Sequence, residues 1–300
     1  MGIRYKGLFC NGGGGVRHHS PDRKSEQAWQ AVLIKIGQTG IGILQGATGE
    51  INSWTRSAAM EYKYSKDDNF EDFACGRVLY HRSGMPCFPV RLADEIFKRC
   101  MGYLGKQNDI VFFDPCCGGG YMATVLGLLN PEAIRKFVCS DIDEEAVGLA
   151  RSNLSLLTMD GLLRRREQIA GMLGTFGKQS HRDALKSADR FIRIVQDRPF
   201  VPEIKCFTAD ALDKTAFCGS DFIADIVIAD VPYGNLSTWS GEKADAVDLL
   251  LDSIKCVVYG NSVTAVVCDK SQKVRNSSYK RLERFKAGKR VVEVLKLIQT

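Results

Sequence analysis

The 300-residue sequence contains no long apolar run. A transmembrane helix needs about 20 consecutive apolar residues, and polar or charged residues interrupt every apolar stretch of this chain before that length is reached. The first residues also lack the apolar core and the small-residue cleavage site of a signal peptide. We therefore expect a cytoplasmic protein with no membrane association.

Metal-ligand spacing is missing as well. The eleven cysteines form no C-x-x-C pair, and none of the four histidines stands at a zinc-ligand spacing from a cysteine. We therefore expect no metal centre. The cysteines are scattered through predicted strands and helices, which is typical of reduced, mostly buried thiols in an intracellular protein.

Positive charge is concentrated near the two ends of the sequence. Residues 1–59 hold seven Lys and Arg against three acidic residues, and residues 270–300 hold ten against two. The segment 60–269 is acidic, with 24 basic and 30 acidic residues. A basic C-terminal edge, which includes Lys273 and Arg275, predicts a polyanionic partner. The alternative is a solvated charged face with no partner.

Residues 1–59 differ in composition from the rest of the chain. They contain eleven of the 29 glycines, including four in a row at 12–15, and no sustained apolar period. We expect them to form a disordered N-terminal extension with at most a short helix. The patterned remainder predicts one domain over residues 60–300.

Apolar runs that end in aspartate recur along this domain. The strand-like runs are DIVFFD (109–114), FVCSD (137–141), KCFTAD (205–210), DIVIAD (225–230) and SVTAVVCD (262–269). The helical patterns that precede or separate them lie at 90–101, 120–129, 144–157 and 244–258. Such alternation predicts an α/β fold with a doubly wound parallel sheet, in which ligands bind beyond the carboxyl ends of the strands. All five aspartates stand at that edge.

A glycine-rich stretch, FFDPCCGGGYMA (112–123), follows the first predicted strand. Read as Gly118-x-Gly120-x-x-Ala123, it matches the dinucleotide fingerprint of a dehydrogenase. Read from Asp114, it is similar to the cofactor loop of S-adenosylmethionine enzymes. Both readings predict a strand, a tight turn and a helix, so this loop leaves the two cofactors open.

The last apolar run favours the second cofactor. VVEVLKLI (291–298) follows a turn at Gly288 without an intervening helix, which predicts a strand antiparallel to its neighbour. The seven-stranded, mostly parallel Rossmann-like sheet of class I methyltransferases ends in such a hairpin. The dehydrogenase sheet is parallel throughout.

Carboxylates after the second and third strands fit a nucleoside-containing cofactor. Asp141 lies about 20 residues past the glycine loop, where an acidic side chain accepts hydrogen bonds from ribose hydroxyls. It serves both cofactors equally. Asp143 directly precedes two glutamates and is predicted to cap the next helix. Asp210, at the third strand end, is a candidate acceptor for the adenine amino group.

The fourth strand end distinguishes the two cofactors. There the chain runs from a predicted buried strand into Asp230, Val231, Pro232 and Tyr233. This resembles the [DNS]-P-P-[YF] motif of methyltransferases that act on planar amino groups, with Val231 where a first proline is commoner. A carboxylate accepting the N–H bonds of such a group returns electron density to the nitrogen. Proline fixes the loop, and the aromatic ring stacks on a flat substrate. A nicotinamide enzyme has no use for this arrangement.

Residues 159–198 form an insertion between the second and third strands. An apolar stripe at 185, 188, 192 and 195 indicates one helix, and Arg164, Arg165 and Arg166 begin another helical stretch. The pair is expected to be either a lid or RNA-facing arm, or a structural hairpin whose charges are solvated. The sequence leaves both open.

From residue 60 onward the sequence resembles the avilamycin-resistance ribosomal RNA methyltransferases. The matching segments are FPVRLADEIF (88–97), DPCCGGGY (114–121), TVLGLLN (124–130), SDID (140–143), FGK (176–178), DVPYG (230–234), WSG (239–241) and RLERFKAGKR (281–290). Gly119 stands where the family more usually has Ser. Residues 1–59 have no counterpart.

The resemblance implies S-adenosylmethionine as cofactor and a guanine of large-subunit ribosomal RNA as substrate. The residues implied for the cofactor are Asp114, Cys116, Gly118 and Gly120 on its methionine and ribose side, Asp141 at the ribose, Asp210 at the adenine, and Pro89 and Arg91 near the methionine carboxylate. Those implied for the guanine are Asp230, Pro232 and Tyr233. Trp239, on the following loop, either stacks on RNA or packs in the core.

We expect a monomer that transfers the methyl group in line from the sulfonium to a base nitrogen, preferably the exocyclic amine, without a metal. The basic residues of 164–166 and 270–300 would contact phosphates. A protein-glutamine or DNA-adenine methyltransferase is the first alternative, because a similar motif serves both. A non-catalytic factor of ribosome assembly is the second alternative, and a dehydrogenase is the third.

Overall fold

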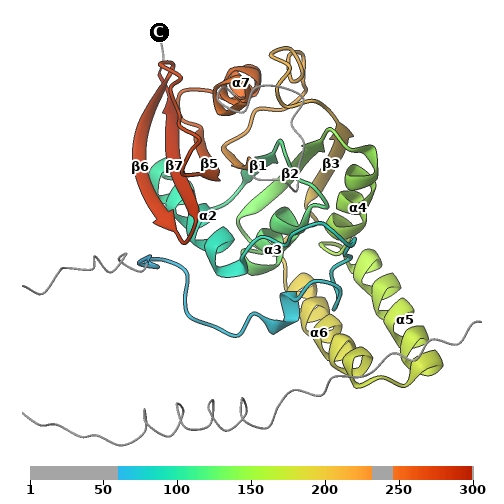
Figure 1. Ribbon diagram of the computed structural model, residues 1–300. Coiled ribbons are helices and arrows are strands. Elements are labelled where there is room, and N and C mark those ends of the chain that lie inside the picture. The colour runs from blue at the N-terminus through green and yellow to red at the C-terminus, as the bar shows by residue number, and fades with distance from the viewer. Residues whose placement is uncertain (1–59, 232–245, 299–300) are drawn as a thin grey trace, which may run out of the picture. The chain divides into compact units, whose positions relative to one another are not determined.

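A seven-stranded sheet runs through the protein, which we describe from a computed structural model over residues 60–231 and 246–298. The strands are β1 (Ile110–Asp114), β2 (Ile134–Asp141), β3 (Glu203–Thr208), β4 (Ile226–Asp230), β5 (Val263–Asp269), β6 (Tyr279–Ala287) and β7 (Arg290–Leu297). Their order is β3-β2-β1-β4-β5-β7-β6 (Figure 1). β1 to β5 are parallel, whereas β7 is antiparallel to both β5 and β6. The predicted sheet and its terminal hairpin are therefore confirmed, and β6 is an edge strand that the sequence patterns did not delimit.

Helices cover both faces of this sheet. They are α2 (Val90–Leu104), α3 (Tyr121–Leu129), α4 (Glu144–Ser155), α5 (Met159–Phe176), α6 (Gln179–Gln196) and α7 (Ala246–Ser253), with the 3-10 helices η1 (Glu71–Phe73) and η3 (Ile254–Val257). Successive side chains of a strand point to opposite faces. Phe112 accordingly packs in the core formed with α2 to α6, and Phe113 packs in the core formed with α7 and η3. Burial on both faces explains why the central strands are continuous apolar runs.

The predicted insertion is a pair of helices, α5 and α6, which lie side by side and extend away from the sheet (Figure 1). α5 begins after Thr158, whose hydroxyl accepts a hydrogen bond from the N–H of Gly161. α6 carries an apolar stripe, with Ala184, Ala188 and Phe191 buried. Of the stripe predicted from the sequence, Ala188 is buried, whereas residues 185, 192 and 195 are only partly buried.

Arg165, in α5 of this insertion, is buried. The Nε of Arg165 donates to the carbonyl of Val78 at 2.7 Å, and its guanidinium lies 4.2 Å from the centre of the Tyr80 ring. This corrects the predicted RNA contact of Arg165, because its donors are directed into the protein and attach an N-terminal segment to α5. Arg164 and Arg166 are exposed, and Arg166 forms an ion pair with α6.

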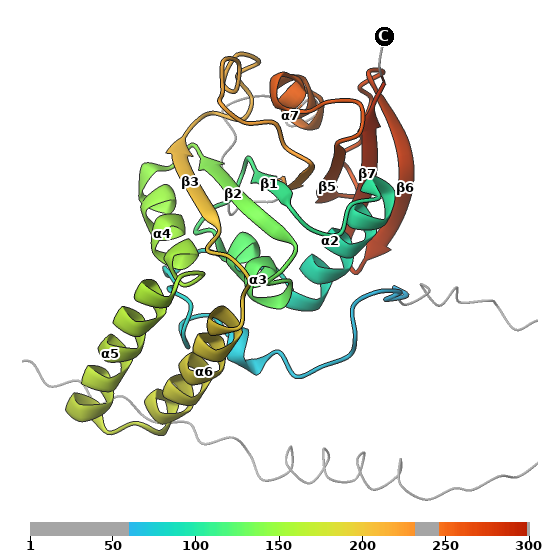
Figure 2. The ribbon, with the colours of Figure 1, turned by 180° about the vertical axis from the view of Figure 1, so that it is seen from behind.

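Residues 60–89, here called the strap, run along the helical layer before α2 begins (Figures 1 and 2). The buried carboxylate of Glu95 in α2 accepts hydrogen bonds from the backbone N–H groups of residues 63–65 at 2.8–2.9 Å. Asp72 in turn accepts a hydrogen bond from Ser187 of α6 at 2.7 Å. Polar contacts therefore hold the strap at several points, although it has almost no regular secondary structure.

Four cysteines contradict the expectation of reduced thiols. The structure joins Cys75 to Cys87 and Cys218 to Cys256 as disulfides, with Cα–Cα distances of 6.7 and 5.2 Å. The partners are 12 and 38 residues apart, and only the fold brings them within the distance that a disulfide requires. Six other described cysteines are free thiols, four of them buried.

Two further predictions concern disorder near the N-terminus and membrane-spanning helices. The disorder predicted for residues 1–59 concerns residues outside those described. Within residues 60–231 and 246–298, no helix is long and apolar enough to cross a membrane.

Candidate functional site

A cavity of about 740 Å³ lies at the carboxyl ends of β1, β2 and β4. This size is in the range of small-molecule sites. The sheet contributes the residues that follow each of these strands, and the loop after β3 contributes one more side. The strap closes the cavity with residues 82–88. The predicted residues that line it are Asp114, Cys116, Gly118, Asp141, Asp210 and Asp230. Four of the five aspartates that follow predicted strands therefore line one cavity, whereas Asp269, at the end of β5, does not.

The glycine loop approaches this cavity with its backbone. Gly118 and Gly120 have φ angles of +50° and +70°, which side-chain-bearing residues seldom adopt. A Cβ on Gly120 would also stand 2.9 Å from the Cα of Ala150 in α4. The N–H of Gly118 donates to the carboxylate of Asp141 at 2.8 Å. Both glycines are therefore required by geometry, and Gly120 sits at the start of α3, where the helix dipole favours negative charge.

Two acidic side chains form the floor of the cavity. Asp114 is 1% exposed, and burial raises its pKa well above the ordinary value. Its carboxylate accepts the N–H of Cys116 at 3.2 Å. Asp141 accepts hydrogen bonds from Gly118 and from the N–H of Asp143. Asp143 itself caps α4, because its side chain accepts a hydrogen bond from the backbone N–H of Glu145, as the sequence predicted.

Asp230 ends β4 beside these groups. Burial raises the pKa of its carboxyl to about 6, and the positive charge of Arg290 opposes this increase. Within the described residues its Oδ1 is buried without a hydrogen-bond partner. A buried acceptor without a partner is rare in proteins and points to a ligand donor. The arrangement can therefore accept a proton, or a hydrogen bond from an N–H group, inside the cavity.

Two predicted cofactor residues lie elsewhere. Pro89 precedes α2 as its N-cap residue and does not line the cavity, although its neighbour Phe88 does. Arg91 pairs with Asp67 at 3.0 Å, and its guanidinium stacks 4.1 Å from the ring centre of Tyr62. The expected position of Arg91 at the methionine carboxylate is thus wrong. On the first turn of α2 its side chain contacts the strap.

Sequence reasoning missed the cations of the cavity. Arg290 begins β7 and Arg82 lies on the strap, and both line the cavity. Arg82 forms ion pairs of 2.7 Å with Asp143 and Glu145. Arg290 is the last residue of the RLERFKAGKR segment, which the sequence analysis assigned to the family resemblance and to a basic edge but not to the cavity.

The remaining predicted residues fall into two groups. Pro232, Tyr233 and Trp239 lie outside the described residues. Lys273 and Arg275 are exposed on the segment between β5 and β6, so they are accessible to a partner.

Comparison with known proteins gives a consistent result. The model of the family "rRNA methyltransferase AviRa" matches residues 60–290. The 23S rRNA (guanine(2535)-N(1))-methyltransferase of Streptomyces viridochromogenes is 38% identical over 223 residues, which are 73% of this chain and 88% of that relative. Solved structures of the rRNA methyltransferase aviRa from the same organism, at 1.5 and 2.4 Å, match with a TM-score of 0.71 and 35% identity, covering 79% of this chain and 96% of theirs.

These matches confirm the class I methyltransferase fold expected from the alternating strands and helices. The family model extends over the strap, the glycine loop and the turn before β7, so it includes the parts of the chain that build the cavity. The chain belongs to the AviRa family of rRNA methyltransferases.

Proposed function

We propose that this protein transfers a methyl group from S-adenosylmethionine to N1 of a guanine in 23S rRNA, in the cytoplasm. The observation that carries the proposal is the half-buried carboxylate of Asp230, which lines the same cavity as the glycine loop and whose buried Oδ1 has no partner among the described residues. The acceptor atom and the RNA follow the name of the relative from Streptomyces viridochromogenes.

The residues of the cavity fit S-adenosylmethionine. Its volume is adequate, and Gly118 lines it at a positive φ angle that a residue with a side chain seldom adopts. We assign Gly118 and Gly120 to backbone contact with the cofactor, Asp141 to the ribose and Asp210 to the adenine. Asp114 and Cys116 would line the methionine side. When bound, the cofactor supplies an electrophilic methyl group on a sulfonium.

Asp230 prepares the nucleophile. Guanine N1 carries a hydrogen, and its lone pair is delocalised into the ring, so the nitrogen must transfer its proton or share it strongly before it can attack. A carboxylate with a pKa near 6 is ionised at neutral pH and is a stronger base than an ordinary aspartate. N1–H and the exocyclic amine lie on the same edge of guanine, so one carboxylate can accept from both. Because the relative from Streptomyces viridochromogenes is named for methylation at N1, we revise the expected acceptor from the exocyclic amine to N1.

The substrate base must leave its stack to enter the cavity. A nucleotide in an RNA loop does so at least cost, and exposed bases are what proteins recognise in RNA. We propose that Pro232 and Tyr233, which directly follow Asp230, hold the flipped guanine, and that Trp239 stacks on neighbouring RNA. Their placement is a prediction from the motif.

Mapping the product tests this function. Purified protein, S-adenosylmethionine and 23S rRNA should yield one modified guanosine, identified as 1-methylguanosine by mass spectrometry of nuclease fragments. Protein and DNA fractions of the same reaction should acquire no label. Modification at the exocyclic amine would refute the N1 assignment, and label in glutamine or adenine would refute the RNA substrate.

The basic edge is expected to bind the RNA backbone. Lys273→Gln combined with Arg275→Gln should weaken rRNA binding about tenfold and reduce the slope of log affinity against log salt concentration by about 2, since each lost phosphate contact removes about one released counterion. Filter-binding assays at several salt concentrations between 50 and 200 mM measure both the affinity and its salt dependence. Lys214→Gln, on the acidic body and paired with Asp252, should leave the slope unchanged. An unchanged slope in the double variant would contradict the assignment.

A further inference from the structure

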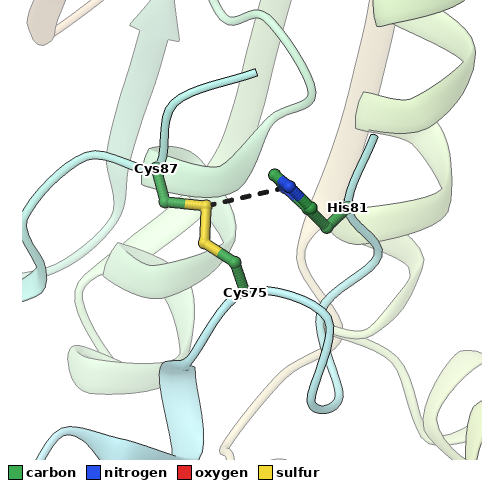
Figure 3. A group of neighbouring side chains, drawn as sticks. All are labelled: Cys75, His81 and Cys87. Carbon is green, nitrogen blue, oxygen red and sulfur yellow. Dashed lines mark hydrogen bonds between the residues drawn. A yellow bond between two sulfur atoms is a disulfide. The ribbon is translucent and has the colours of Figure 1, made fainter. Parts of the chain in front are cut away.

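Two cysteines and a histidine meet on the strap beside the cavity. Cys75 and Cys87 are joined as a disulfide, and Nδ1 of His81 lies 3.9 Å from Sγ of Cys87 (Figure 3). The imidazole is exposed, and Cys87 is partly exposed. None of these three residues has a part in the proposed methyl transfer. They are nevertheless within reach of solvent reagents and next to the cofactor site.

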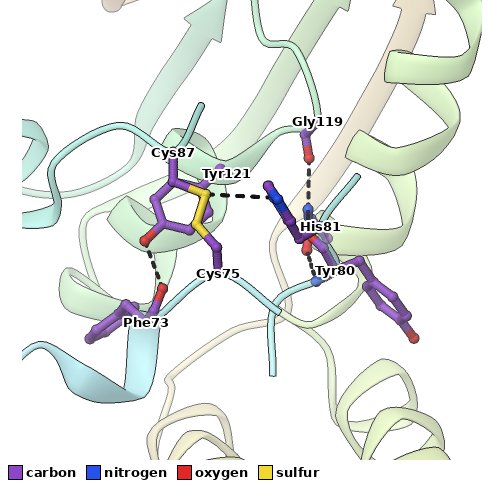
Figure 4. Close-up of a disulfide and its surroundings, with 8 residues drawn as sticks. Phe73, Cys75, Tyr80, His81, Cys87, Gly119 and Tyr121 are labelled. Atoms are coloured by element: carbon purple, nitrogen blue, oxygen red, sulfur yellow. Dashed lines mark hydrogen bonds between the residues drawn. A yellow bond between two sulfur atoms is a disulfide. The ribbon is translucent and has the colours of Figure 1, made fainter. Parts of the chain in front are cut away.

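The disulfide connects two parts of the strap that differ in how they are held. The part that follows Cys75 is anchored, because Val78 and Leu79 are fully buried. Asn153 of α4 also accepts the N–H of Tyr80 at 2.7 Å and donates to its carbonyl at 3.0 Å. Just before Cys75, the Tyr121 hydroxyl donates to the carbonyl of residue 73 at 2.6 Å (Figure 4).

The other part, residues 82–87, is the wall of the cavity. Ser83, Gly84 and Pro86 are exposed, and the wall contributes no side chain to either core except through the neighbouring Phe88. Its ion pairs, from Arg82 to α4, are at its first residue and half exposed. At its other end the wall is covalently attached to the anchored part by the bond between the two cysteines. Breaking this bond removes a restraint at the point where the wall meets the cavity.

We propose that the Cys75–Cys87 pair is a thiol–disulfide exchange site whose oxidised form holds the wall in place and thereby sets the affinity of the cavity for its cofactor. The identity of that cofactor rests on the proposed function. Disulfides of cytosolic proteins are usually transient or redox-sensing, and an exposed one is the kind that dithiols reduce. A wall that must be ordered on binding lowers the affinity for the ligand.

The exchange is complete with a dithiol as reductant. One thiolate of the dithiol attacks Sγ of Cys75, the Cys75–Cys87 bond breaks, and Cys87 leaves as a thiolate beside His81. A protonated His81 stabilises that thiolate or gives it a proton, which makes Cys87 the better leaving group. The second thiolate of the dithiol then attacks the mixed disulfide and releases Cys75. Two electrons pass from the dithiol, which becomes a cyclic disulfide.

The second disulfide is a built-in control. Cys218 and Cys256 are both exposed, so the same reductant reaches them. Neither residue lines the cavity, and their bond joins the loop after β3 to η3. Any effect of reduction that comes from the loss of a disulfide in general should therefore also appear when this bond is removed.

Two measurements on the 300-residue chain test the inference. Calorimetry gives the affinity for S-adenosylhomocysteine, and hydrogen–deuterium exchange reports on the wall, residues 82–87. Each is measured with the protein oxidised and with the protein reduced by dithiothreitol. Reduction should weaken binding about tenfold and increase exchange in the wall, since these residues then pay the ordering entropy on binding. Cys75→Ser under oxidising conditions should behave as the reduced protein. The double variant Cys218→Ser with Cys256→Ser should retain the full response.

Equal affinity and equal wall exchange in the two redox states would overturn the inference. The inference would also be overturned if the reduced protein retained one Zn²⁺ per chain and the hydrogen–deuterium exchange of the wall did not change. Cys75, His81 and Cys87 would then form a metal site. If S-adenosylhomocysteine binds neither state, the cofactor of the proposed function is wrong, and the hydrogen–deuterium exchange of residues 82–87 alone decides whether the disulfide holds the wall.

Discussion

Asp230→Asn is expected to reduce methyl transfer to 23S rRNA about 10³-fold and to leave the affinity for S-adenosylhomocysteine within a factor of about three. The asparagine amide cannot take a proton from N1. Its NH₂ group is itself a hydrogen-bond donor and cannot accept the N1–H. Loss of general base catalysis typically lowers rates by 10²–10⁴. Single-turnover rates with labelled cofactor, combined with calorimetry, separate the chemical step from binding.

The pH dependence gives the same residue a second signature. Transfer by the wild type should fall as the pH decreases through about 6, where Asp230 becomes protonated. Because the folded protein favours the protonated form, stability from this group is fully present below about 3.8 and is lost as the pH rises through about 6. Asp230→Asn should therefore be more stable than wild type at pH 8, by about 1–3 kcal/mol.

Asp269→Asn is the matched control. Asp269 ends the neighbouring strand β5 but does not line the cavity, so this variant should retain normal turnover. Near-normal turnover in Asp230→Asn would remove the base from the mechanism. Loss of cofactor affinity equal to the loss of rate would instead make Asp230 part of the cofactor site.

Glu95→Gln is expected to destabilise the protein by about 2–4 kcal/mol. Glu95 is fully buried, accepts three backbone N–H groups of the strap and pairs with Arg99. Removing one partner of a buried ion pair leaves the other charge uncompensated, although here Arg99 keeps a second pair with Glu283. Urea unfolding at pH 7 measures the loss.

The pH dependence of stability provides a second test of the role of Glu95. Burial acts to raise the pKa of Glu95, but the N–H groups of residues 63–65 and Arg99 hold it below its usual 4.5. Its contribution to stability is present above about 4.5 and is lost as the pH falls through the lower folded value. The difference in unfolding free energy between the wild type and Glu95→Gln should therefore become smaller as the pH falls. Glu71→Gln, at an exposed pair 3.9 Å from Arg77, should change stability by less than about 0.5 kcal/mol. Equal losses in both variants would contradict the role assigned to Glu95.

Six of the seven strands and the aspartates of the cavity could be predicted because both depend on local signals. A buried parallel strand is an apolar run, and its polar end residue marks the ligand edge of the sheet. Asp114, Asp141 and Asp230 follow this rule directly. Asp143 was predicted as a cap from the two glutamates behind it. Gly120 was predicted from a loop pattern whose positive φ the structure shows.

The errors concern residues whose role depends on contacts far away in the sequence. Arg165 looks like its two neighbours, but it alone faces the strap, more than 80 residues earlier in the chain. Arg91 was assigned to the cofactor because it precedes α2, whereas the fold turns it to the strap. No sequence pattern indicates that Cys75 and Cys87 are partners, and the strap has no apolar periodicity. Arg290 reaches the cavity only because β7 inserts between β5 and β6.

The edge strand β6 has a consequence for the solution behaviour of the protein. An uncovered edge offers unpaired backbone groups to a strand of another molecule, and lysine and arginine side chains oppose such pairing. On β6 the side chains of Lys280, Arg281, Arg284 and Lys286 are exposed. The same charge that suits a polyanion thus protects the sheet from intermolecular β-pairing. Variants that neutralise β6 risk aggregation, which is a reason to probe nucleic-acid binding on the loop at 273 and 275 instead.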